Sequence, residues 1–366
     1  MSGFRVFYTV QLTSGESIHE RLNVLCREQS AELPQDVIRN IGMEHVVGVP
    51  ESIHQVSEKQ WEAEIIWPLS NIDEDITQFL NLLFGNISLM RGIKITGLSW
   101  ADLPENLFPG PQFGITGIRK KWNIPERALS CTALKPMGFT TGKLAGLCYK
   151  FARAGVDIIK DDHGLANQST ASFEERVTAC QKAISRAREE TGKNSRYFPN
   201  VTASPSEIFK RIEFALEKKV EGILISPHLA GLGIMKEIQK YKIPIMAHPA
   251  FSGQLVSDPT HGFSIPFLYG SLWRALGADF IIYPNTGGRF SFSTLDCASL
   301  NTEARKDSPL GFAASWPTPG GGIQRETIPH WLNAYGNDTV FLTGGSLYQH
   351  PKGIEIAASE FVNMLT

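Results

Sequence analysis

The segment 155–163 places an ammonium group, two carboxylates and an imidazole directly behind a short apolar run. The run is typical of a buried β-strand, and in α/β folds the loops that follow such strands carry the chemistry. A lysine beside acids is either a stabilising ion-pair cluster or part of a metal site, and the pattern alone favours neither. The polar residues in question are Lys160, Asp161, Asp162 and His163.

Two further polar residues end apolar runs of the same kind. Lys135 closes the run 131–134, where a buried amine would give up its proton readily; the alternative is a lysine whose charged end reaches solvent. His248 closes the run 243–247. A lone histidine in such a run is more often a hydrogen-bonded core residue, but a place at a strand end makes an acid–base role equally plausible.

Two glycine clusters, 318–323 and 342–346, follow the last two apolar runs. Glycine lets backbone N–H groups approach an anion, so both clusters together favour a phosphate site over mere tight turns. The glycines expected to contact the phosphate are Gly321, Gly322, Gly344 and Gly345. The sequence contains no Walker loop, no Gly-x-Ser-x-Gly elbow and no helix motif with two histidines.

Eight short apolar runs, most separated by amphipathic helical patterns, predict a closed parallel (β/α)₈ TIM barrel over residues 126–366. Capping-box patterns at 172–175 and 204–207 mark two of its helix starts, and Gly155 is expected to end the helix before it. The active site should lie where the strands end. The expected strands are 131–135, 156–160, 196–202, 222–226, 243–248, 279–284, 312–316 and 340–344.

Residues 1–125 predict a separate, small α+β domain of ferredoxin-like type. Apolar alternation or short apolar runs suggest strands at 4–12, 45–49, 61–67, 87–90 and 93–96, with helices at 18–26 and 73–84. The Pro- and Gly-rich segment 103–114 is interpreted as the linker between the domains.

The composition is that of an ordinary globular protein, with 42% hydrophobic residues and a net charge of -2. This balance argues against nucleic acid or a membrane surface as the main partner. No apolar run reaches the roughly 18 residues of a membrane span. The N-terminus lacks a signal-peptide layout, and five scattered cysteines suit a reducing compartment, so a cytoplasmic protein is expected.

The order of these motifs resembles the RuBisCO large-chain superfamily over nearly the whole chain. The segment 135–137, Lys-Pro-Met, is similar to the family's Lys-Pro-Lys on strand one, and 155–163 is similar to its Gly-x-Asp-x-x-Lys-x-Asp-Glu. The segments 247–250, 285–289 and 344–345 fall in the family's order. Ala-His-Pro-Ala at 247–250 is typical of the non-carboxylating RuBisCO-like proteins.

The resemblance implies a metal site and a shared active site. The lysine matching Lys160 adds CO₂ to form a carbamate, which together with Asp162 and the residue at the place of His163 holds Mg²⁺; Mg²⁺ polarises a ketose carbonyl and stabilises an enediolate. Lys135 and His248 are then the acid–base candidates. Asn86 matches an asparagine that reaches the barrel of a partner subunit in a homodimer, and Glu28 resembles a glutamate of the same partner domain.

Several departures from the family pattern argue against carboxylation of ribulose bisphosphate. His163 replaces the third acidic ligand, and imidazole suits Mg²⁺ poorly, so another metal, a water ligand or loss of the metal are all open. Met137 replaces the second strand-one lysine, and the loop lysine needed for CO₂ addition has only Arg289 in its region. Pro249 stands where carboxylases carry a phosphate-binding arginine, and the strand-six histidine is also missing from 280–283.

The loss of one phosphate site implies a substrate with a single phosphate and a less polar far end. The leading hypothesis is an isomerase or enolase that removes an α-proton from 5-methylthioribulose 1-phosphate, an intermediate of methionine salvage. One alternative is a decarboxylase or hydrolase of a branched 3-oxo-acid sugar phosphate of the 3-oxo-isoapionate 4-phosphate type, because loss of CO₂ gives the same enolate. An alternative of another class is a non-catalytic sugar-phosphate sensor.

Overall fold

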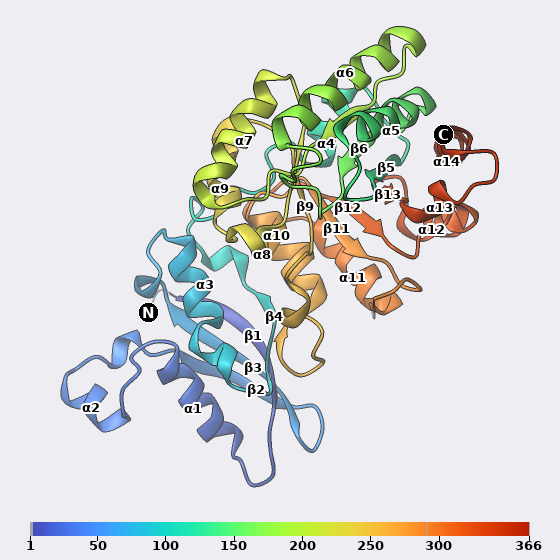
Figure 1. Ribbon diagram of the computed structural model, residues 1–366. Coiled ribbons are helices and arrows are strands. Elements are labelled where there is room, and N and C mark those ends of the chain that lie inside the picture. Colours follow the sequence, from blue (N-terminus) through green and yellow to red (C-terminus); the bar gives the residue numbers. More distant parts are fainter. Residues whose placement is uncertain (1–2, 291, 366) are drawn as a thin grey trace. The chain divides into compact units, whose positions relative to one another are not determined.

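The structure, a computed structural model, describes residues 3–290 and 292–365, and these form two compact units (Figure 1). The first unit holds the chain through Pro109 together with Ser252–Leu268 and Asp307–Phe312. The second holds Gly110–Phe251, Tyr269–Lys306 and the chain from Ala313 onward. Among the described residues no helix combines the length and apolarity needed to cross a membrane.

The first unit is built on a five-stranded, mostly antiparallel sheet. Strict alternation in β1 buries every second side chain, and the helices add the apolar residues that complete this core. In sheet order the strands are β10 (Gly262–Phe263), β4 (Ile93–Leu98), β1 (Gly3–Gln11), β3 (Gln60–Pro68) and β2 (Val49–Gln55). The helices are α1 (Ile18–Glu28), α2 (Gln35–Asn40) and α3 (Ile76–Phe84).

Two strands expected in this unit are absent from the described chain. The segment expected at 45–49 is instead a 3-10 turn, Glu44–Val46, followed by the start of β2. The segment expected at 87–90 lies mostly in a second 3-10 turn, Asn86–Leu89, which buries Ile87 and leaves Leu89 86% exposed. Both sides of β4, the next strand along the chain, are already paired with β1 and β10, so this four-residue apolar run cannot pair with it as a hairpin partner.

The second unit confirms the predicted barrel. Its eight parallel strands form a ring that a bridge between Asn200 and Leu224 closes. In ring order the strands are β7 (Arg196–Phe198), β6 (Ile158–Asp161), β5 (Leu129–Leu134), β13 (Val340–Leu342), β12 (Trp316–Gly320), β11 (Phe280–Pro284), β9 (Ile245–Ala247) and β8 (Ile223–Ile225).

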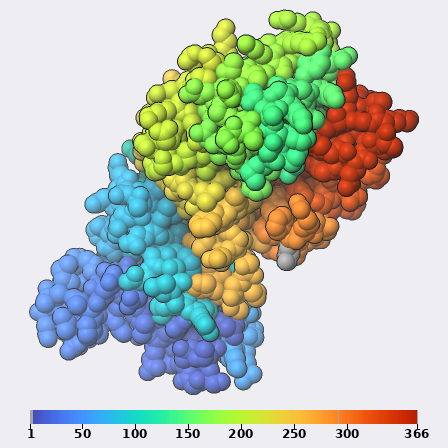
Figure 2. Space-filling model, in the orientation of Figure 1, coloured from blue at the N-terminus to red at the C-terminus, as the bar shows by residue number. Residues whose placement is uncertain are grey.

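Most helices of the second unit cover the outside of this ring, whereas Gly114–Trp122 packs against its interior. Each amphipathic helix packs its apolar face against the strands. Helix α5 contacts both α6 and α14, and Figure 2 shows the red C-terminal segment beside green segments of this layer. The helices are α4 (Gly114–Trp122), α5 (Thr141–Ala154), α6 (Phe173–Thr191), α7 (Pro205–Glu217), α8 (Pro227–Ala230), α9 (Ile234–Ile238), α10 (Trp273–Ala275), α11 (Thr294–Arg305), α12 (Ile328–Tyr335), α13 (Gly345–Tyr348) and α14 (Ile354–Asn363).

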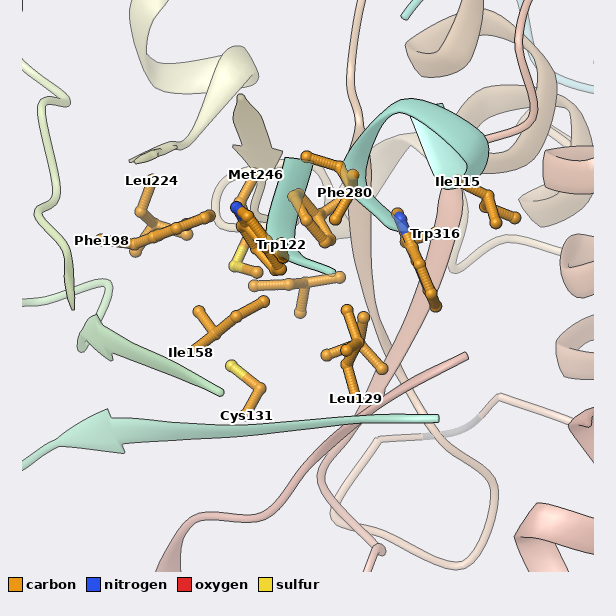
Figure 3. Close-up of a cluster of buried hydrophobic side chains, with 13 residues drawn as sticks. Ile115, Trp122, Leu129, Cys131, Ile158, Phe198, Leu224, Met246, Phe280 and Trp316 are labelled. Atoms are coloured by element: carbon orange, nitrogen blue, oxygen red, sulfur yellow. The ribbon is translucent and has the colours of Figure 1, made fainter. Parts of the chain in front are cut away.

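The barrel interior is a packed apolar layer (Figure 3). Side chains from the strands point toward one another there, and Trp122 of α4 stacks on Phe280 at a ring distance of 5.8 Å. Along a strand, every second side chain points into the barrel. Cys131 and Ile158 belong to this layer, so the next inward residues, Ala133 and Lys160, form the layer closer to the carboxyl ends of the strands. Lys160 of the predicted site therefore lies directly above an apolar core.

The structure tests three local predictions for the barrel: one strand position is wrong, two helix caps lack the expected hydrogen bond, and one helix end is confirmed. The seventh strand runs over Trp316–Gly320 rather than 312–316, because Ala314 O accepts the Ile115 N–H at the start of α4 and the prolines within 316–320 hid the strand pattern. The capping side chains of Ser172 and Ser204 make no cap hydrogen bond, although α6 and α7 begin directly after them. Gly155 ends α5 in the left-handed conformation, as predicted.

Candidate active site

Lys160 lies inside the barrel near the carboxyl end of β6. Its side chain is only 2% exposed, and Nζ donates a hydrogen bond to the Asp161 carbonyl oxygen at 3.1 Å. Burial lowers the pKa of Lys160, since an ammonium ion loses its hydration there. A larger neutral fraction makes the amine a better nucleophile, which is the property that addition of CO₂ requires.

Asp161 points to the opposite face of β6 and serves the structure. Its carboxylate is fully buried and accepts hydrogen bonds from Arg176 Nε at 3.1 Å, Tyr197 Oη at 2.7 Å and the Asn200 N–H at 2.9 Å. These contacts occupy both oxygens, so the possibility that Asp161 binds a metal beside Asp162 is not supported. The segment 160–163 thus contains both an ion-pair cluster and a candidate site, on alternate residues.

Asp162, Lys135 and His163 meet at the end of the strands. Lys135 Nζ lies 2.9 Å from Asp162 Oδ1, and His163 Nδ1 lies 3.6 Å from the same oxygen. Burial alone would raise the pKa of Asp162, but the His163 imidazole and the charges of Lys160 and Lys135 lower it overall, so the carboxylate stays ionised. The Lys135 side chain is 36% exposed and paired, which agrees with the alternative that its charged end reaches solvent rather than with a buried amine.

His248 joins this group through its ring. The imidazoles of His248 and His163 stack with centroids 4.8 Å apart and planes 13° from parallel. The Ala250 N–H donates to His248 Nδ1 at 3.1 Å, so a neutral His248 carries its proton on Nε2. Burial lowers the pKa of His248 well below its usual value, and the charges of Lys160 and His163 lower it further, which keeps the ring neutral.

The two glycine turns lie at this same end of the barrel. Gly320 at the end of β12 pairs with Leu342 of β13, so the turns follow neighbouring strands. A Cβ on Gly344 would lie 3.8 Å from Lys135 Cε, which places that turn beside the polar group. Gly321 and Gly322 have positive φ, and a Cβ on Gly322 would meet the backbone of Thr286 and Gly288 within 3 Å.

Polar atoms without a hydrogen-bond partner flank these turns; Asn285 was a candidate from the sequence, whereas Thr343 and Ser346 were missed. Within the described chain, the buried side-chain atoms Thr343 Oγ1, Ser346 Oγ and Asn285 Nδ2 make no hydrogen bond. Thr343 and Ser346 flank the pair Gly344–Gly345, and Asn285 follows β11 next to β12. Hydroxyl residues directly beside a glycine pair were a visible signal in the sequence, and unsatisfied polar groups at such turns suit a polar ligand.

Asn86 and Glu28 belong to the first unit and hydrogen-bond to each other. Asn86 Nδ2 donates to Glu28 Oε1 at 3.1 Å. Asn86 starts the 3-10 turn that follows α3, and Glu28 is the last residue of α1. Two residues 58 positions apart, which the resemblance assigned to one shared role, thus lie together within their own unit. Their approach to a partner's barrel stays a prediction.

The donor set decides whether a metal ion fits. In the described residues no three His, Cys, Asp or Glu side chains are grouped as metal ligands. The Asp162 carboxylate and the His163 imidazole are adjacent, however, and a carbamate on the buried amine of Lys160 would add a second anionic oxygen ligand. With that modification the residues fit a divalent ion; without it, they provide too few oxygen ligands for Mg²⁺.

Fold and site together define a barrel protein with a lysine–carboxylate–histidine group and glycine turns at the carboxyl ends of its strands. Residues 114–291 match the family model described as "Ribulose bisphosphate carboxylase large chain, catalytic domain". The chain is 34% identical to the 5-methylthioribulose-1-phosphate isomerase of Rhodospirillum rubrum, over 94% of this chain and 91% of that protein.

Two further comparisons point to the same family. The chain is 34% identical to the 2,3-diketo-5-methylthiopentyl-1-phosphate enolase of Bacillus licheniformis, over 84% of this chain and 76% of that protein. The crystal structure of a Rubisco-like protein from Rhodopseudomonas palustris superposes with a TM-score of 0.88 at 31% identity, covering 99% of this chain and 97% of that one. The protein therefore belongs to the RuBisCO large-chain family, as the motif order predicted.

Proposed function

We propose that this protein is an enzyme that removes a proton α to the carbonyl of a singly phosphorylated ketose, with 5-methylthioribulose 1-phosphate as the first candidate substrate and isomerisation as the outcome. The observation that carries the proposal is the contact between two groups. Lys135 pairs with Asp162 at 2.9 Å, while its Cε lies against the Gly344 turn. A proton-transfer residue and a candidate phosphate turn are thus adjacent.

Lys135 Nζ is the proposed base. As an ammonium it donates to Asp162. After it gives a proton to solvent water, which its 36% exposed side chain can reach, the same nitrogen can accept the α-proton of a bound ketose. His248 is proposed as the donor to the carbonyl oxygen, because its proton lies on Nε2 while Nδ1 is occupied by the Ala250 N–H. This assignment refines the acid–base roles left open by the sequence.

The proposed resident metal is Mg²⁺, held by carbamylated Lys160, Asp162 and the position of His163. When bound, it would polarise the ketose carbonyl and stabilise negative charge on oxygen. Lys160 itself contributes a buried amine with a lowered pKa, and Asp162 a carboxylate that stays ionised. The glycine turns and the hydroxyls of Thr343 and Ser346 would hold the single phosphate.

The names of two similar proteins support proton removal from a phosphorylated substrate, but they differ in the product formed. One relative is named an isomerase of a methylthio sugar phosphate and another an enolase of a related diketone phosphate. Both names describe a singly phosphorylated substrate with a methylthio end. The missing arginine at Pro249 and the missing lysine at Met137 agree with such a substrate, and with the absence of carboxylase activity.

The test follows carbon-bound protons. Purified protein with Mg²⁺ and bicarbonate is incubated with 5-methylthioribulose 1-phosphate in D₂O, and NMR records loss of C–H signals and formation of products. We expect deuterium incorporation in the wild type and none in Lys160→Ala. Equal exchange in both proteins would refute the proposed role of the site. If the protein releases CO₂ from a 3-oxo-acid sugar phosphate but causes no deuterium exchange in 5-methylthioribulose 1-phosphate, the decarboxylase alternative is favoured. If it binds the sugar phosphate tightly and causes no exchange, the sensor alternative is favoured.

We further propose a cytoplasmic homodimer in which Asn86 and Glu28 complete the partner's barrel site. Their mutual hydrogen bond orients both side chains in one unit, as residues with a common ligand require. Lys135, Asp162, His163 and His248 include no amide side chain, and Asn285 lies beside the glycine turns, so the Asn86 amide would add a further donor to the site.

A further inference from the structure

The hydroxyl group of Tyr348 makes two hydrogen bonds to the backbone beside Lys135 that a neighbouring strand would otherwise make. Tyr348 is the last residue of α13, the short helix that begins at Gly345. Its Oη accepts the Lys135 backbone N–H at 3.0 Å and donates to the Ala133 carbonyl oxygen at 2.9 Å. No local pattern predicts this contact, since the residues are 213 positions apart.

The strand register explains why a hydroxyl is needed there. The Leu129 N–H donates to Thr339 O, and Cys131 O accepts the Thr343 N–H, so the backbone groups of every second residue of β5 point toward β13. Ala133 O and Lys135 N are next in this series. In the described chain β13 ends at Leu342 and turns away at Gly344, so no strand residue stands opposite them.

Tyr348 therefore sets the backbone from which the Lys135 side chain departs. Its ring packs edge-on against Phe151 of α5, with centroids 5.9 Å apart, which fixes the position of the hydroxyl. Burial raises the pKa of the Tyr348 phenol, so the hydroxyl keeps the proton that it donates to Ala133. The turn Gly344–Gly345 lies at the other end of the same four-residue helix, and a Cβ on Gly344 would lie 3.8 Å from Lys135 Cε.

We propose that Tyr348 is a positioning residue that links occupancy of the Gly344–Gly345 turn to the placement of Lys135. A phosphate bound at the turn restricts the motion of α13. Because the Tyr348 hydroxyl hydrogen-bonds to Ala133 and Lys135, the backbone at the end of β5 is then restricted as well. The substrate's phosphate then contributes to proton transfer as well as to binding. This inference rests on the phosphate site of the proposed function.

The first test separates catalysis from binding. Tyr348→Phe keeps the ring against Phe151 and removes only the hydroxyl. We expect kcat for proton exchange to fall about tenfold to a hundredfold, as for a misplaced catalytic group, with KM changed less than threefold or so. The matched control is Tyr241→Phe, whose hydroxyl donates to Glu213 at 2.8 Å on the barrel's outer surface, and which should leave both constants unchanged.

The second test compares the wild-type protein with Tyr348→Phe and does not depend on turnover. Exchange of the Lys135 backbone N–H is followed by NMR with and without inorganic phosphate, whose binding is measured by calorimetry. We expect phosphate to slow this exchange in the wild type, and to bind Tyr348→Phe without slowing it.

The outcomes distinguish the two proposals. Phosphate binding with unchanged exchange at Lys135 would overturn the role of Tyr348, as would a folded Tyr348→Phe protein with wild-type kcat. If phosphate does not bind, the phosphate site of the proposed function fails and this inference fails with it. If phosphate slows the exchange but no ketose reacts, the linkage stands and the proposed reaction is wrong.

Discussion

At the scale of single residues, two of the buried cations of the barrel, Lys160 and Arg176, have opposite roles. Arg176 is fully buried and satisfies the Asp161 carboxylate, together with the carbonyl oxygens of Ala171 and Ala166. Lys160 is similarly buried, but among the described residues its ammonium group donates a single hydrogen bond, to a backbone oxygen. A buried charge without a close anionic partner costs stability, so Lys160 is explained by function rather than by the fold.

This difference predicts opposite effects of the same substitution. Lys160→Met should leave the free energy of unfolding unchanged or raise it by about 1 kcal/mol, because an apolar side chain replaces a buried amine. Arg176→Met should lower it by about 3–5 kcal/mol, because it leaves the Asp161 carboxylate buried without its cation. Urea denaturation of both variants measures the two values. Strong destabilisation by Lys160→Met would mean that Lys160 is structural.

A pH effect on stability is expected from His228. Trp273 Nε1 donates to His228 Nε2 at 3.3 Å, and burial lowers the pKa of His228 from its ordinary 6.5 to about 4. Between these values the unfolded chain takes up a proton and the folded protein does not, so stability present above pH 6.5 is lost as the pH falls toward 4. The loss amounts to about 3 kcal/mol at 1.36 kcal/mol per unit.

The matched variant is His228→Gln, whose side-chain oxygen can accept the Trp273 N–H but does not titrate. Urea denaturation from pH 7 to pH 4 should show the wild type losing about 3 kcal/mol more than this variant. Parallel curves for the two proteins would contradict the prediction.

At the scale of elements, the turns after β11 and β12 hold each other in place. A Cβ on Gly322 would lie 2.8 Å from Gly288 N and 2.9 Å from Thr286 O, while a Cβ on Gly321 would meet nothing within 4 Å. Both glycines have positive φ, so alanine strains either position, but only at 322 does it also force two turns apart.

Gly322→Ala should therefore raise KM for a phosphorylated ketose by about tenfold or more, as expected when a close backbone approach to an anion is lost. Gly321→Ala is the comparison within the same turn. Gly321 is also a candidate phosphate contact, but its alanine does not force the two turns apart, so it should raise KM less and lower stability by about 1 kcal/mol. Steady-state kinetics and thermal unfolding of both variants are the measurements. An equal rise of KM in both would show that φ alone, and not the contact between turns, matters.

At the scale of the whole molecule, the proposed shared site predicts complementation between two defective proteins. Lys160→Ala damages the barrel, and Asn86→Ala removes the amide that donates to Glu28 in the first unit. If sites are shared in a homodimer, a heterodimer of the two variants has one undamaged site.

Mixed in equal amounts after unfolding and refolding together, the two variants should recover about a quarter of wild-type turnover, because half of the dimers are mixed and one of their two sites is intact. Each variant refolded alone is the control and should stay nearly inactive. A mixture no more active than its components would exclude shared sites.

The sequence by itself determined the barrel and the order of its motifs. Hydrophobic runs, glycines such as Gly155 and the polar segment 160–163 are local features, and local periodicity reports strand and helix directly. Short runs without alternation were the weak point: 45–49 and 87–90 form 3-10 turns, and the proline-containing strand β12 lies four residues later than expected.

Only the tertiary structure decided which face each polar residue serves. It assigned Asp161 to Arg176 and Asp162 to Lys135, brought His163 onto His248, and placed the Tyr348 hydroxyl at the end of β5. These contacts join residues far apart in the chain or on opposite sides of one strand. Their geometry follows from ring closure of the barrel and the lengths of neighbouring strands, which no single segment encodes.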